Sequence, residues 1–406
     1  MMKSATQSCL NILQTLPYTT GQSIIHFTDH NNHQKTWLGL TPTTTHDLTT
    51  LSDIQHLETN LAHTQPNTPC VWTLATSYEW GLTQLKNTQT PSHIVALQYH
   101  HGYWLNHTLN TIEPFGTPEL IPSKPTPINT PTATISPLWS QSDFANAIHT
   151  AQHAIKEGDI YQVNLSYPCT ITSNASLSDI YRYLLQQNIP NHAAFIKTDH
   201  TTIASCSPEE FIYIHDNTIR TRPIKGTIGR HANPTLDQAA YNTLKHSEKD
   251  KAELIMITDL LRNDLGQCCD IGSVTVNELC AIKAYDYVYH LVSTITGTLQ
   301  TQNPLQTLAT LSPGGSISGC PKHAACNIIQ TIEPYPRQFY TGNMGFIAST
   351  GEAAFNIAIR TCYQTTNAPI FTHTGCGITT DSNPKDEYQE SLDKLRFLTD
   401  YIKHVD

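Results

Sequence analysis

The sequence predicts an α+β fold built on antiparallel sheets. Helix-like and strand-like segments follow one another without the regular strand–helix–strand alternation that builds a parallel sheet. Near the C-terminus, residues 340–348 and 353–361 have the pattern of two strands on either side of Ser-Thr-Gly-Glu at 349–352. This arrangement predicts a hairpin, which makes its two strands antiparallel neighbours. The 406 residues are enough for roughly two or three average domains or for one large core.

The composition is that of a globular chain without a basic surface. Lys and Arg number 23 against 33 Asp and Glu, and this formal net charge of -10 argues against nucleic acid as a partner. No apolar run approaches the ~18 residues of a membrane helix, and the N-terminal residues lack the apolar stretch of a secretory signal. Because the 11 Cys are scattered and odd in number, we expect reduced thiols and a cytoplasmic protein without a membrane partner.

The first part of the chain, residues 1–135, is predicted to be a β-rich half. Short apolar segments at 71–74 and 94–97 are separated by Asn, Gln, His and Pro, a pattern typical of strands joined by loops. Residues 121–137 contain five prolines, a density that excludes a helix or a central strand. We therefore expect a connector that crosses the surface there.

The patterning is sharper after this connector. Ser142 is suited to cap a helix whose apolar residues recur at helical spacing and which Gly158 closes. Residues 161–166 then alternate apolar and polar side chains. This alternation predicts a strand with one apolar face, beginning at Tyr161, and one polar face.

Lys225 is the first candidate for a chemical role. If the residues before it form a strand, its side chain lies on the less polar face, shared with Ile219, Thr221 and Pro223. Partial burial there favours the uncharged amine, which can act as a nucleophile or as a base. The alternative is a lysine at a strand end whose amine reaches water, and these residues alone leave both readings open.

Three glutamates stand out as possible metal ligands. Glu253 lies on a predicted helix, about 248–263, on the same face as apolar residues, where a carboxylate is costly to bury unless it is paired or bound to a metal. Glu387 and Glu390 share one face at the start of the last predicted helix, about 384–402. Carboxylates alone suit Mg²⁺. Acidic residues in a first helical turn also stabilise the helix dipole, so a purely structural role stays open.

Two glycine-rich segments and one arginine could bind an anion. Residues 312–322 have the look of a phosphate loop, but Cys-Pro-Lys follows the last glycine, so the Walker pattern is not met. Gly375 and Gly377 flank a cysteine and could present backbone N–H groups to a carboxylate. Arg360, which the strand 353–361 would place among small side chains, could bind a carboxylate in a bidentate manner. Tight turns and an exposed ion pair are the alternatives.

Together these segments resemble the chorismate-utilising enzymes, and within that family the branch of aminodeoxychorismate synthase component I. The resemblance covers residues 140–402. Its matching segments are 159–166, 207–211, 222–227, 252–266, 314–322, 359–361 and 381–390. It implies a large antiparallel β-sandwich wrapped by helices, which residues 1–135 complete as a divergent N-terminal half. The sequence departs from the family at Cys376, where relatives usually carry Gly or Ala.

One position separates the branches of this family. Pro-Ile-Lys-Gly-Thr at 223–227 resembles the aminodeoxychorismate synthases, whereas anthranilate synthases typically carry Ala at the position of Lys225. Enzymes that make isochorismate or salicylate place a water-activating Lys where this chain has Gln162, and a glutamine cannot deprotonate water. The alternatives are anthranilate synthase component I and a chorismate-binding subunit without catalysis. The second alternative predicts loss of catalytic residues such as Glu253, which this chain retains.

The resemblance also implies a site and its chemistry. Glu253, Glu387 and Glu390 would hold Mg²⁺, which binds the ring carboxylate of chorismate. Lys225 would attack C2 and form a covalent intermediate, while Glu209 would protonate the departing C4 hydroxyl and then accept a proton from ammonia. The residues expected to bind the substrate are Gln162, Thr227, His290, Arg360, Gly375, Gly377 and Lys394. The product would be 4-amino-4-deoxychorismate, a precursor of p-aminobenzoate and folate, with ammonia supplied by a glutaminase subunit.

Overall fold

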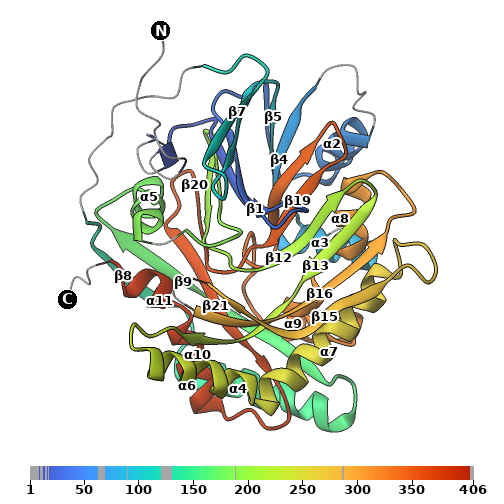
Figure 1. Cartoon of the computed structure of the whole chain (residues 1–406). Helices are drawn as coiled ribbons and strands as arrows, with labels where there is room; N and C mark the ends of the chain where they lie inside the picture. Colours follow the sequence, from blue (N-terminus) through green and yellow to red (C-terminus); the bar gives the residue numbers. More distant parts are fainter. Residues whose placement is uncertain are drawn as a thin grey trace.

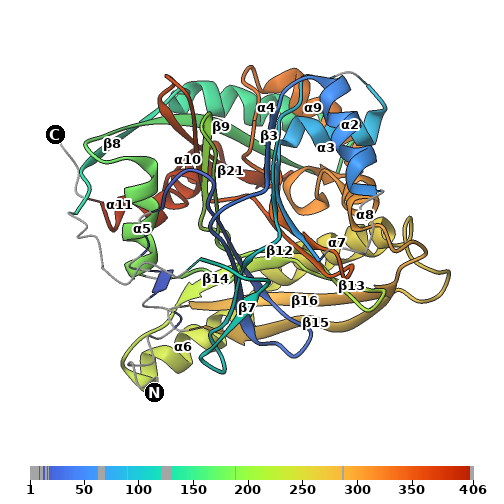
Figure 2. The same ribbon diagram turned by 90° about the horizontal axis from the view of Figure 1, so that it is seen from above.

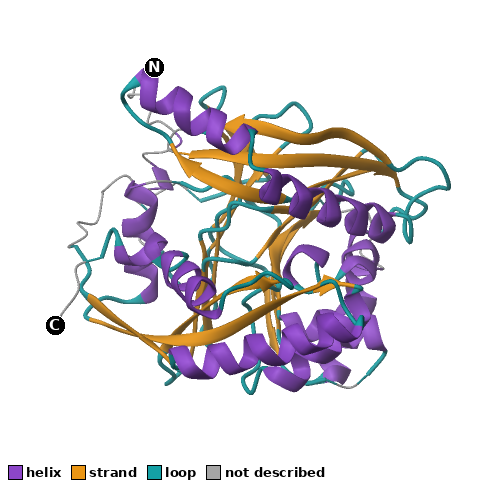
Figure 3. Ribbon diagram, turned by 90° about the horizontal axis from the view of Figure 1, so that it is seen from below, coloured by secondary structure: helices purple, strands orange, loops and turns teal. Residues whose placement is uncertain are grey.

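A computed structural model describes residues 18–62, 69–88, 90–119, 130–187, 189–285 and 288–402, together with Cys9, Ile12, Leu13 and Leu16. Two large antiparallel sheets form the interior, and helices lie around them (Figures 1 and 3). This arrangement confirms the predicted α+β sandwich. None of the helices in the described part of the chain is long and apolar enough to cross a membrane.

The first sheet gathers strands from both ends of the chain. Its strands are β1 (Ser23–Thr28), β2 (Gln34–Gly39), β6 (Gly102–Asn106), β7 (Thr111–Phe115), β8 (Ala133–Pro137), β9 (Gln162–Ser173), β10 (Ala194–Lys197), β11 (Thr201–Ser205), β17 (Gly319–Cys320), β20 (Thr361–Thr365) and β21 (Ile370–Ile378). Their order is β17-β9-β21-β20-β11-β10-β1-β2-β6-β7, with β8 paired to β9. The antiparallel pairing of β1 with β10 joins the first half of the chain to the second.

The second sheet carries the predicted hairpin. Its strands are β3 (Thr44–Leu48), β4 (Val71–Thr76), β5 (Ile94–Tyr99), β12 (Glu210–His215), β13 (Thr218–Arg222), β14 (Ile224–Gly229), β15 (Thr275–Ala284), β16 (Val288–Thr298), β18 (Asn343–Ala348) and β19 (Ala353–Ile357). Their order is β14-β16-β13-β12-β19-β18-β4-β5-β3, with β15 paired to β16. β18 and β19 pair antiparallel across the 349–352 turn, and β4 and β5 confirm the two strands expected at 71–74 and 94–97.

Helices cover the outer faces of the sheets. They are α2 (Leu51–Ala62), α3 (Tyr78–Lys86), α4 (Gln141–Glu157), α5 (Leu177–Gln187), α6 (Pro234–Lys245), α7 (Glu248–Leu265), α8 (Pro304–Leu311), the 3₁₀ helix η1 (Gly315–Ile317), α9 (Lys322–Ile332), α10 (Pro384–Asp393) and α11 (Arg396–Thr399). α4 and α10 pack on β9 and β21, whereas α6 and α7 pack on β14 and β16. In Figure 2, α4, α9, α3 and α2 lie along one side of the molecule.

The two sheets pack face to face through a shared core. The rings of Phe27 on β1 and Phe346 on β18 lie edge to face, with centroids 4.9 Å apart, and both side chains are buried. Trp37 on β2 belongs to the same cluster as Leu97 on β5. Burial of large aromatic and aliphatic side chains between the layers is the main force that holds the sheets together.

The structure corrects the predicted start of the helix after the connector. The N-cap of α4 is Ser140 and not Ser142, because the Ser140 hydroxyl accepts a hydrogen bond from the Asp143 N–H while the Asp143 carboxylate accepts one from the Ser140 N–H. This reciprocal pair is a capping box, and it satisfies two backbone donors that a cap at Ser142 would leave open. Gly158 closes the helix as predicted, at φ 84°.

Two further segments differ from the sequence prediction. Residues 133–137 of the expected connector form the strand β8, which pairs with β9 and lies off the main strand order, where Pro137 is tolerated. Residues 121–129 of that connector lie outside the described residues. Tyr161 precedes β9 and is 68% exposed, although we expected it on a buried face. In contrast Gln162 is buried, because α4, α9 and η1 all pack against this strand.

The last predicted helix is interrupted. α10 ends at Asp393 and α11 begins at Arg396, so Lys394 is the C-cap of α10. The turn directs Leu395 and Leu398 into the core, where both are buried. Their burial explains why the chain bends at this point, and the bend leaves Lys394 beside β21.

Candidate functional site

Lys225 and Glu253 meet between a strand and the helix that covers it. Lys225 lies on β14 and Glu253 on α7, and the Lys225 Nζ is 3.9 Å from Glu253 Oε2. Both side chains are about one-fifth exposed, at 21% and 23%. Gly226 follows at φ 64°, and a Cβ there would lie 2.8 Å from Leu244 Cδ1 and 2.9 Å from Asp250 Cγ. Glycine is therefore required for β14 to approach α6 and α7 this closely.

Thr227 and His290 lie opposite each other on neighbouring strands. Thr227 pairs with His290 in the register of β14 and β16, and a bulge separates this pair from Lys225. The Thr227 Oγ1 and His290 Nδ1 are 2.8 Å apart. Burial, with a smaller contribution from the charge of Arg360, lowers the pKa of His290 to about 4, so its imidazole is neutral near pH 7.

Glu209 is a buried carboxyl group held by a hydroxyl. It lies just before β12 and is 6% exposed. Its Oε1 accepts a hydrogen bond of 2.7 Å from the Ser316 hydroxyl in η1. Burial raises the pKa of Glu209 to about 7, against the opposing effects of Ser316 and of the Lys225 charge. A carboxyl group with this pKa can both donate and accept a proton near neutral pH.

Arg360 is placed differently from the sequence prediction. β19 ends at Ile357, and Arg360 lies in the crossing that carries the chain from β19 in one sheet to β20 in the other, at φ 49°. Among the described residues no Asp or Glu carboxylate raises the pKa of its guanidinium, and burial lowers that pKa. A largely buried arginine without a counter-ion is costly, so its position favours binding of an anion.

The two glycines of the second glycine-rich segment lie on a strand and not in a turn. Gly375 and Gly377 belong to β21 and pair with Ser166 and Asn164 of β9, which overturns the expected nest of N–H groups. A Cβ on Gly377 would lie 2.3 Å from Gln162 Nε2, so glycine makes room for this buried amide. In the described structure the Gln162 Oε1 has no hydrogen-bond partner.

Lys394 links this strand to the last helix pair. Its Nζ donates a hydrogen bond of 3.0 Å to the Gly375 carbonyl and lies 2.8 Å from Glu390 Oε1. Burial alone would raise the pKa of Glu390, but Lys394, with smaller contributions from Lys249 and Lys225, holds it below its ordinary value. Glu390 is therefore an ionised carboxylate near neutral pH.

The acidic residues of α10 form a potential metal site. Donor atoms of Cys376, Glu387 and Glu390 all lie within 4.8 Å of one another. Glu387 is buried, and its Oε1 accepts a hydrogen bond of 2.7 Å from the Ser382 hydroxyl. The two carboxylates fit Mg²⁺, a hard ion that prefers oxygen, whereas the Cys376 thiol donates to the Glu387 carbonyl and is a poor ligand for it. Glu253 is not part of this group and lies beside Lys225.

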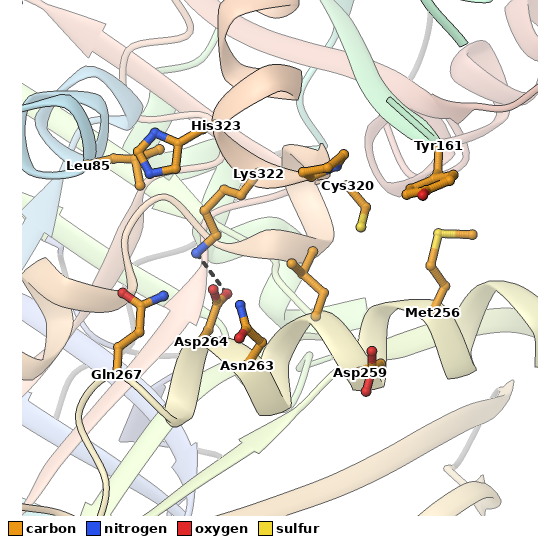
Figure 4. A pocket seen from close by; sticks show the side chains of 12 residues that line it. Leu85, Tyr161, Met256, Asp259, Asn263, Asp264, Gln267, Cys320, Lys322 and His323 are labelled. Carbon is orange, nitrogen blue, oxygen red and sulfur yellow. Dashed lines mark ion pairs between the residues drawn. The ribbon is translucent and has the colours of Figure 1, made fainter. Parts of the chain in front are cut away.

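A pocket of about 520 Å³ lies between α7 and the start of α9 (Figure 4). Its walls include Met256, Asn263 and Asp264 of α7, and Lys322 and His323 of α9. The buried Asp264 carboxylate forms an ion pair of 2.7 Å with Lys322 Nζ across the pocket floor. No local pattern predicts this pair, because its members are 58 residues apart and meet only in the folded chain.

The glycine-rich segment 312–322 also has a structural role that its pattern did not reveal. It forms η1 and the short strand β17, and it brings Ser316 to Glu209. The unusual density of glycine was visible in the sequence, but the partner of its serine was not. The hydroxyl of Ser316 is therefore a site residue that sequence reasoning missed.

The comparisons with known proteins agree with this geometry. The family described as chorismate binding enzyme matches residues 23–400. The chain belongs to this family. Aminodeoxychorismate synthase component 1 of Klebsiella aerogenes is 37% identical over 269 residues, 65% of this chain and 59% of that protein. Anthranilate synthase component 1 of Saccharolobus solfataricus is 38% identical over 260 residues, 64% of this chain and 62% of that protein.

A solved structure has the same fold as this chain. Anthranilate synthase component I from Streptococcus pneumoniae superposes with a TM-score of 0.74 at 23% identity, over 95% of this chain and 91% of that chain. The chain matches less than two thirds of the length of these two curated relatives, 59% of the first and 62% of the second. Similarity at nearly equal identity to two kinds of synthase leaves the reaction to be decided by individual residues.

Proposed function

We propose that this chain is a cytoplasmic aminodeoxychorismate synthase component I, which converts chorismate and ammonia to 4-amino-4-deoxychorismate for p-aminobenzoate and folate synthesis. In this proposal residues 140–402 carry the catalytic residues, residues 1–135 complete the sheets, and a glutaminase subunit supplies ammonia. The observation that carries the proposal is the position of Lys225. Its amine lies 3.9 Å from Glu253 and close enough to Glu209 to affect the pKa of that carboxyl group.

The substrate is a dicarboxylate, and Arg360 supports its binding. The guanidinium has no carboxylate partner in the described structure, so a substrate carboxylate would supply the missing counter-ion. The neutral His290, hydrogen-bonded to Thr227, offers a further polar contact. Gln162 offers an amide whose oxygen has no protein partner in the described residues. Gly377 leaves room on β21 for this amide, because a Cβ there would lie 2.3 Å from Gln162 Nε2. We include Gly375, which pairs with Ser166, in the proposed substrate site.

Mg²⁺ is the cofactor that the carboxylates fit best. Glu387 and Glu390 would hold it, with Glu253 contributing from α7, and the bound ion would withdraw electrons from the substrate ring through the ring carboxylate. Lys394 lies beside Glu390 and keeps that carboxylate ionised and oriented. The Ser382 hydroxyl, which donates a hydrogen bond of 2.7 Å to Glu387 Oε1, holds that carboxylate in position.

Lys225 and Glu209 would carry out the covalent steps. The Lys225 amine would form a bond to C2, the ring double bonds would shift, and the C4–O bond would break while Glu209 donates the proton that makes the departing group water. Ammonia then attacks C4, the C2–N bond breaks and releases Lys225, and Glu209 accepts a proton from the new amine. Chorismate and ammonia are thereby converted to aminodeoxychorismate and water.

Anthranilate synthase component I is the second candidate, because one of the similar relatives carries that name at 38% identity. In that reaction ammonia itself would attack C2, and a lysine in this position would have no covalent role. Lys225 therefore separates the two candidates. A subunit that binds chorismate without catalysis is a third candidate, which predicts no turnover at all.

The covalent intermediate can be tested directly. The protein is quenched during turnover with chorismate, Mg²⁺ and ammonium and analysed by intact-protein mass spectrometry. We expect an added mass equal to that of chorismate less water. Lys225→Ala should lose this species while keeping its fold, as judged by circular dichroism. Lys251→Ala, which removes a lysine paired with Glu248 on the surface of α7, is the matched control and should keep it. An adduct that persists in Lys225→Ala would refute the assignment.

A further inference from the structure

The pocket between α7 and α9 lies directly behind the catalytic carboxyl group. Gly315 of η1 packs against two residues that line the pocket, Leu260 and Asp264. A Cβ on Gly315 would lie 2.6 Å from Leu260 Cδ2 and 3.4 Å from Asp264 Oδ2, so Gly315 forms part of the wall between the pocket and Glu209. The next residue, Ser316, donates its hydrogen bond to Glu209. The Leu260 side chain and the segment Gly315–Ser316 therefore lie between the pocket and Glu209.

The pocket also follows the helix that carries Glu253. Residues three, four and seven positions apart share a face of a helix. Glu253, Met256 and Leu260 are spaced in this way, Asp264 continues the same face, and Gln267 follows just beyond the end of α7. The pocket thus extends from Gln267, just past the C-terminal end of α7, along the helix to Met256, in the direction of the Lys225–Glu253 pair.

The proposed reaction needs two routes into one centre. Chorismate would approach from the side of Arg360, Lys225 and the carboxylates of α10, and once bound it fills that side. Ammonia must still reach C4 near Glu209. We propose that ammonia free in solution reaches the catalytic centre through the pocket between α7 and α9, past the wall formed by Gly315 and Ser316. This inference rests on the proposed function.

The chemistry of the pocket suits a small nitrogen base. The Asp264 carboxylate already holds one ammonium group, the Lys322 Nζ at 2.7 Å, and the same Nζ donates to the Leu311 carbonyl at 3.2 Å. The side chains of Asn263 and Gln267, which contain amide oxygens, also line the pocket, and these oxygens can accept hydrogen bonds from the N–H groups of ammonia. The Leu260 side chain packs on Gly315, so passage requires that this side chain rotate.

Large side chains at the mouth of the pocket test the route. Asn263→Trp fills it from α7 and His323→Trp from α9, and both native residues are exposed, so neither change disturbs the core. Ile255→Trp is the matched control, because Ile255 is exposed on α7 and does not line the pocket. Steady-state rates are measured with chorismate, Mg²⁺ and ammonium chloride as the source of ammonia, and in parallel with glutamine and the amidotransferase fraction of the native cells.

We expect each pocket variant to raise the KM for ammonium about tenfold, with the KM for chorismate and the rate at saturating ammonium unchanged. The control should match the native chain. An unchanged KM for ammonium, or an equal rise in the KM for chorismate, would overturn the proposal. A loss of rate that occurs only with glutamine and the amidotransferase would also overturn it, because the pocket would then bind the amidotransferase subunit. Absence of any aminated product from the native chain is a different result and would refute the proposed function itself.

Discussion

The Ser316 hydroxyl lies 2.7 Å from the Glu209 Oε1 and donates a hydrogen bond to it, although the two residues are 107 positions apart in the chain. The bond stabilises the ionised form of a carboxyl group that burial would otherwise keep protonated. η1 therefore adjusts the proton affinity of Glu209.

Removal of this hydroxyl should change the pH dependence of the reaction. Because the bond lowers the pKa of Glu209, Ser316→Ala should raise it, by about one unit if the bond to the carboxylate contributes ~1.5 kcal/mol. Protonated Glu209 is needed as the acid, so kcat/KM for chorismate should fall above pH about 7 in the native chain and at higher pH in the variant. The concentration of uncharged ammonia must be held constant across the profile.

Ser316→Thr keeps the hydroxyl and is the control for this experiment. It should restore the native profile. If both variants show the native alkaline limb, the hydrogen bond does not set the proton affinity of Glu209. A uniform loss of rate without a shift in the limb would show only a structural role.

Glu209 should also lower the stability of the fold as the pH rises. Its pKa is raised by burial from the ordinary value of 4.5 to about 7, so the folded state disfavours the carboxylate. The cost of ionisation is absent below pH 4.5, grows between pH 4.5 and 7, and is complete above pH 7. Glu209→Gln removes the charge and keeps an acceptor for Ser316.

We therefore expect Glu209→Gln to be inactive but more stable than the native chain at pH 8, by up to ~3 kcal/mol, with little difference at pH 5. Urea unfolding at the two pH values measures this difference. An equal difference in stability at both values would mean that the ionisation of Glu209 carries no cost in the fold.

Arg360 should act on the affinity for chorismate. Arg360→Gln removes a charged hydrogen-bond donor worth ~1.5–3 kcal/mol, so we expect KM for chorismate to rise by at least about tenfold. Because the native guanidinium lacks a carboxylate partner in the described structure, its loss should not destabilise the fold. Arg262→Gln, which breaks an exposed pair with Asp259, is the control and should leave KM unchanged. A stable variant with native KM would exclude Arg360 from substrate binding.

The carboxylates of α10 should determine the affinity for Mg²⁺. Glu390→Gln keeps the size of the side chain and removes its charge, so we expect Mg²⁺ binding measured by calorimetry to weaken about tenfold or more. Asp386→Asn changes an acidic residue in the same helix that lies outside the cluster, and it should bind Mg²⁺ like the native chain. Equal effects of the two variants would point to a general charge effect and not to ligation.

The local features of the fold were predictable from the sequence because short-range patterns specify them. The 349–352 hairpin, the helix α7 and the closing Gly158 all follow from residues close together in the chain. The site was harder to predict because it depends on distant partners. The sequence singled out Glu253, on an apolar face of a predicted helix, and Lys225, on the less polar face of a predicted strand. Their contact at 3.9 Å, however, depends on how that helix packs on that strand.

Two errors show the same limit. Arg360 seemed to continue a hairpin strand, yet the chain leaves β19 for β20 of the other sheet, and only long-range pairing decides where a strand ends. Gly375 and Gly377 suggested a nest or a turn, yet they lie on β21 because this segment pairs with β9 along its whole length. The glycine at 377 makes room for the Gln162 amide. In both cases a tertiary contact overrode a local preference.

The most direct test of the account is the product formed by the native chain. Purified protein is incubated with chorismate, Mg²⁺ and ammonium at mildly alkaline pH, and the product is identified by chromatography and mass. The account predicts 4-amino-4-deoxychorismate, which an added lyase converts to p-aminobenzoate. Anthranilate as the product would contradict the role of Lys225, and no turnover with ammonium or with a glutaminase subunit would contradict an enzymatic function.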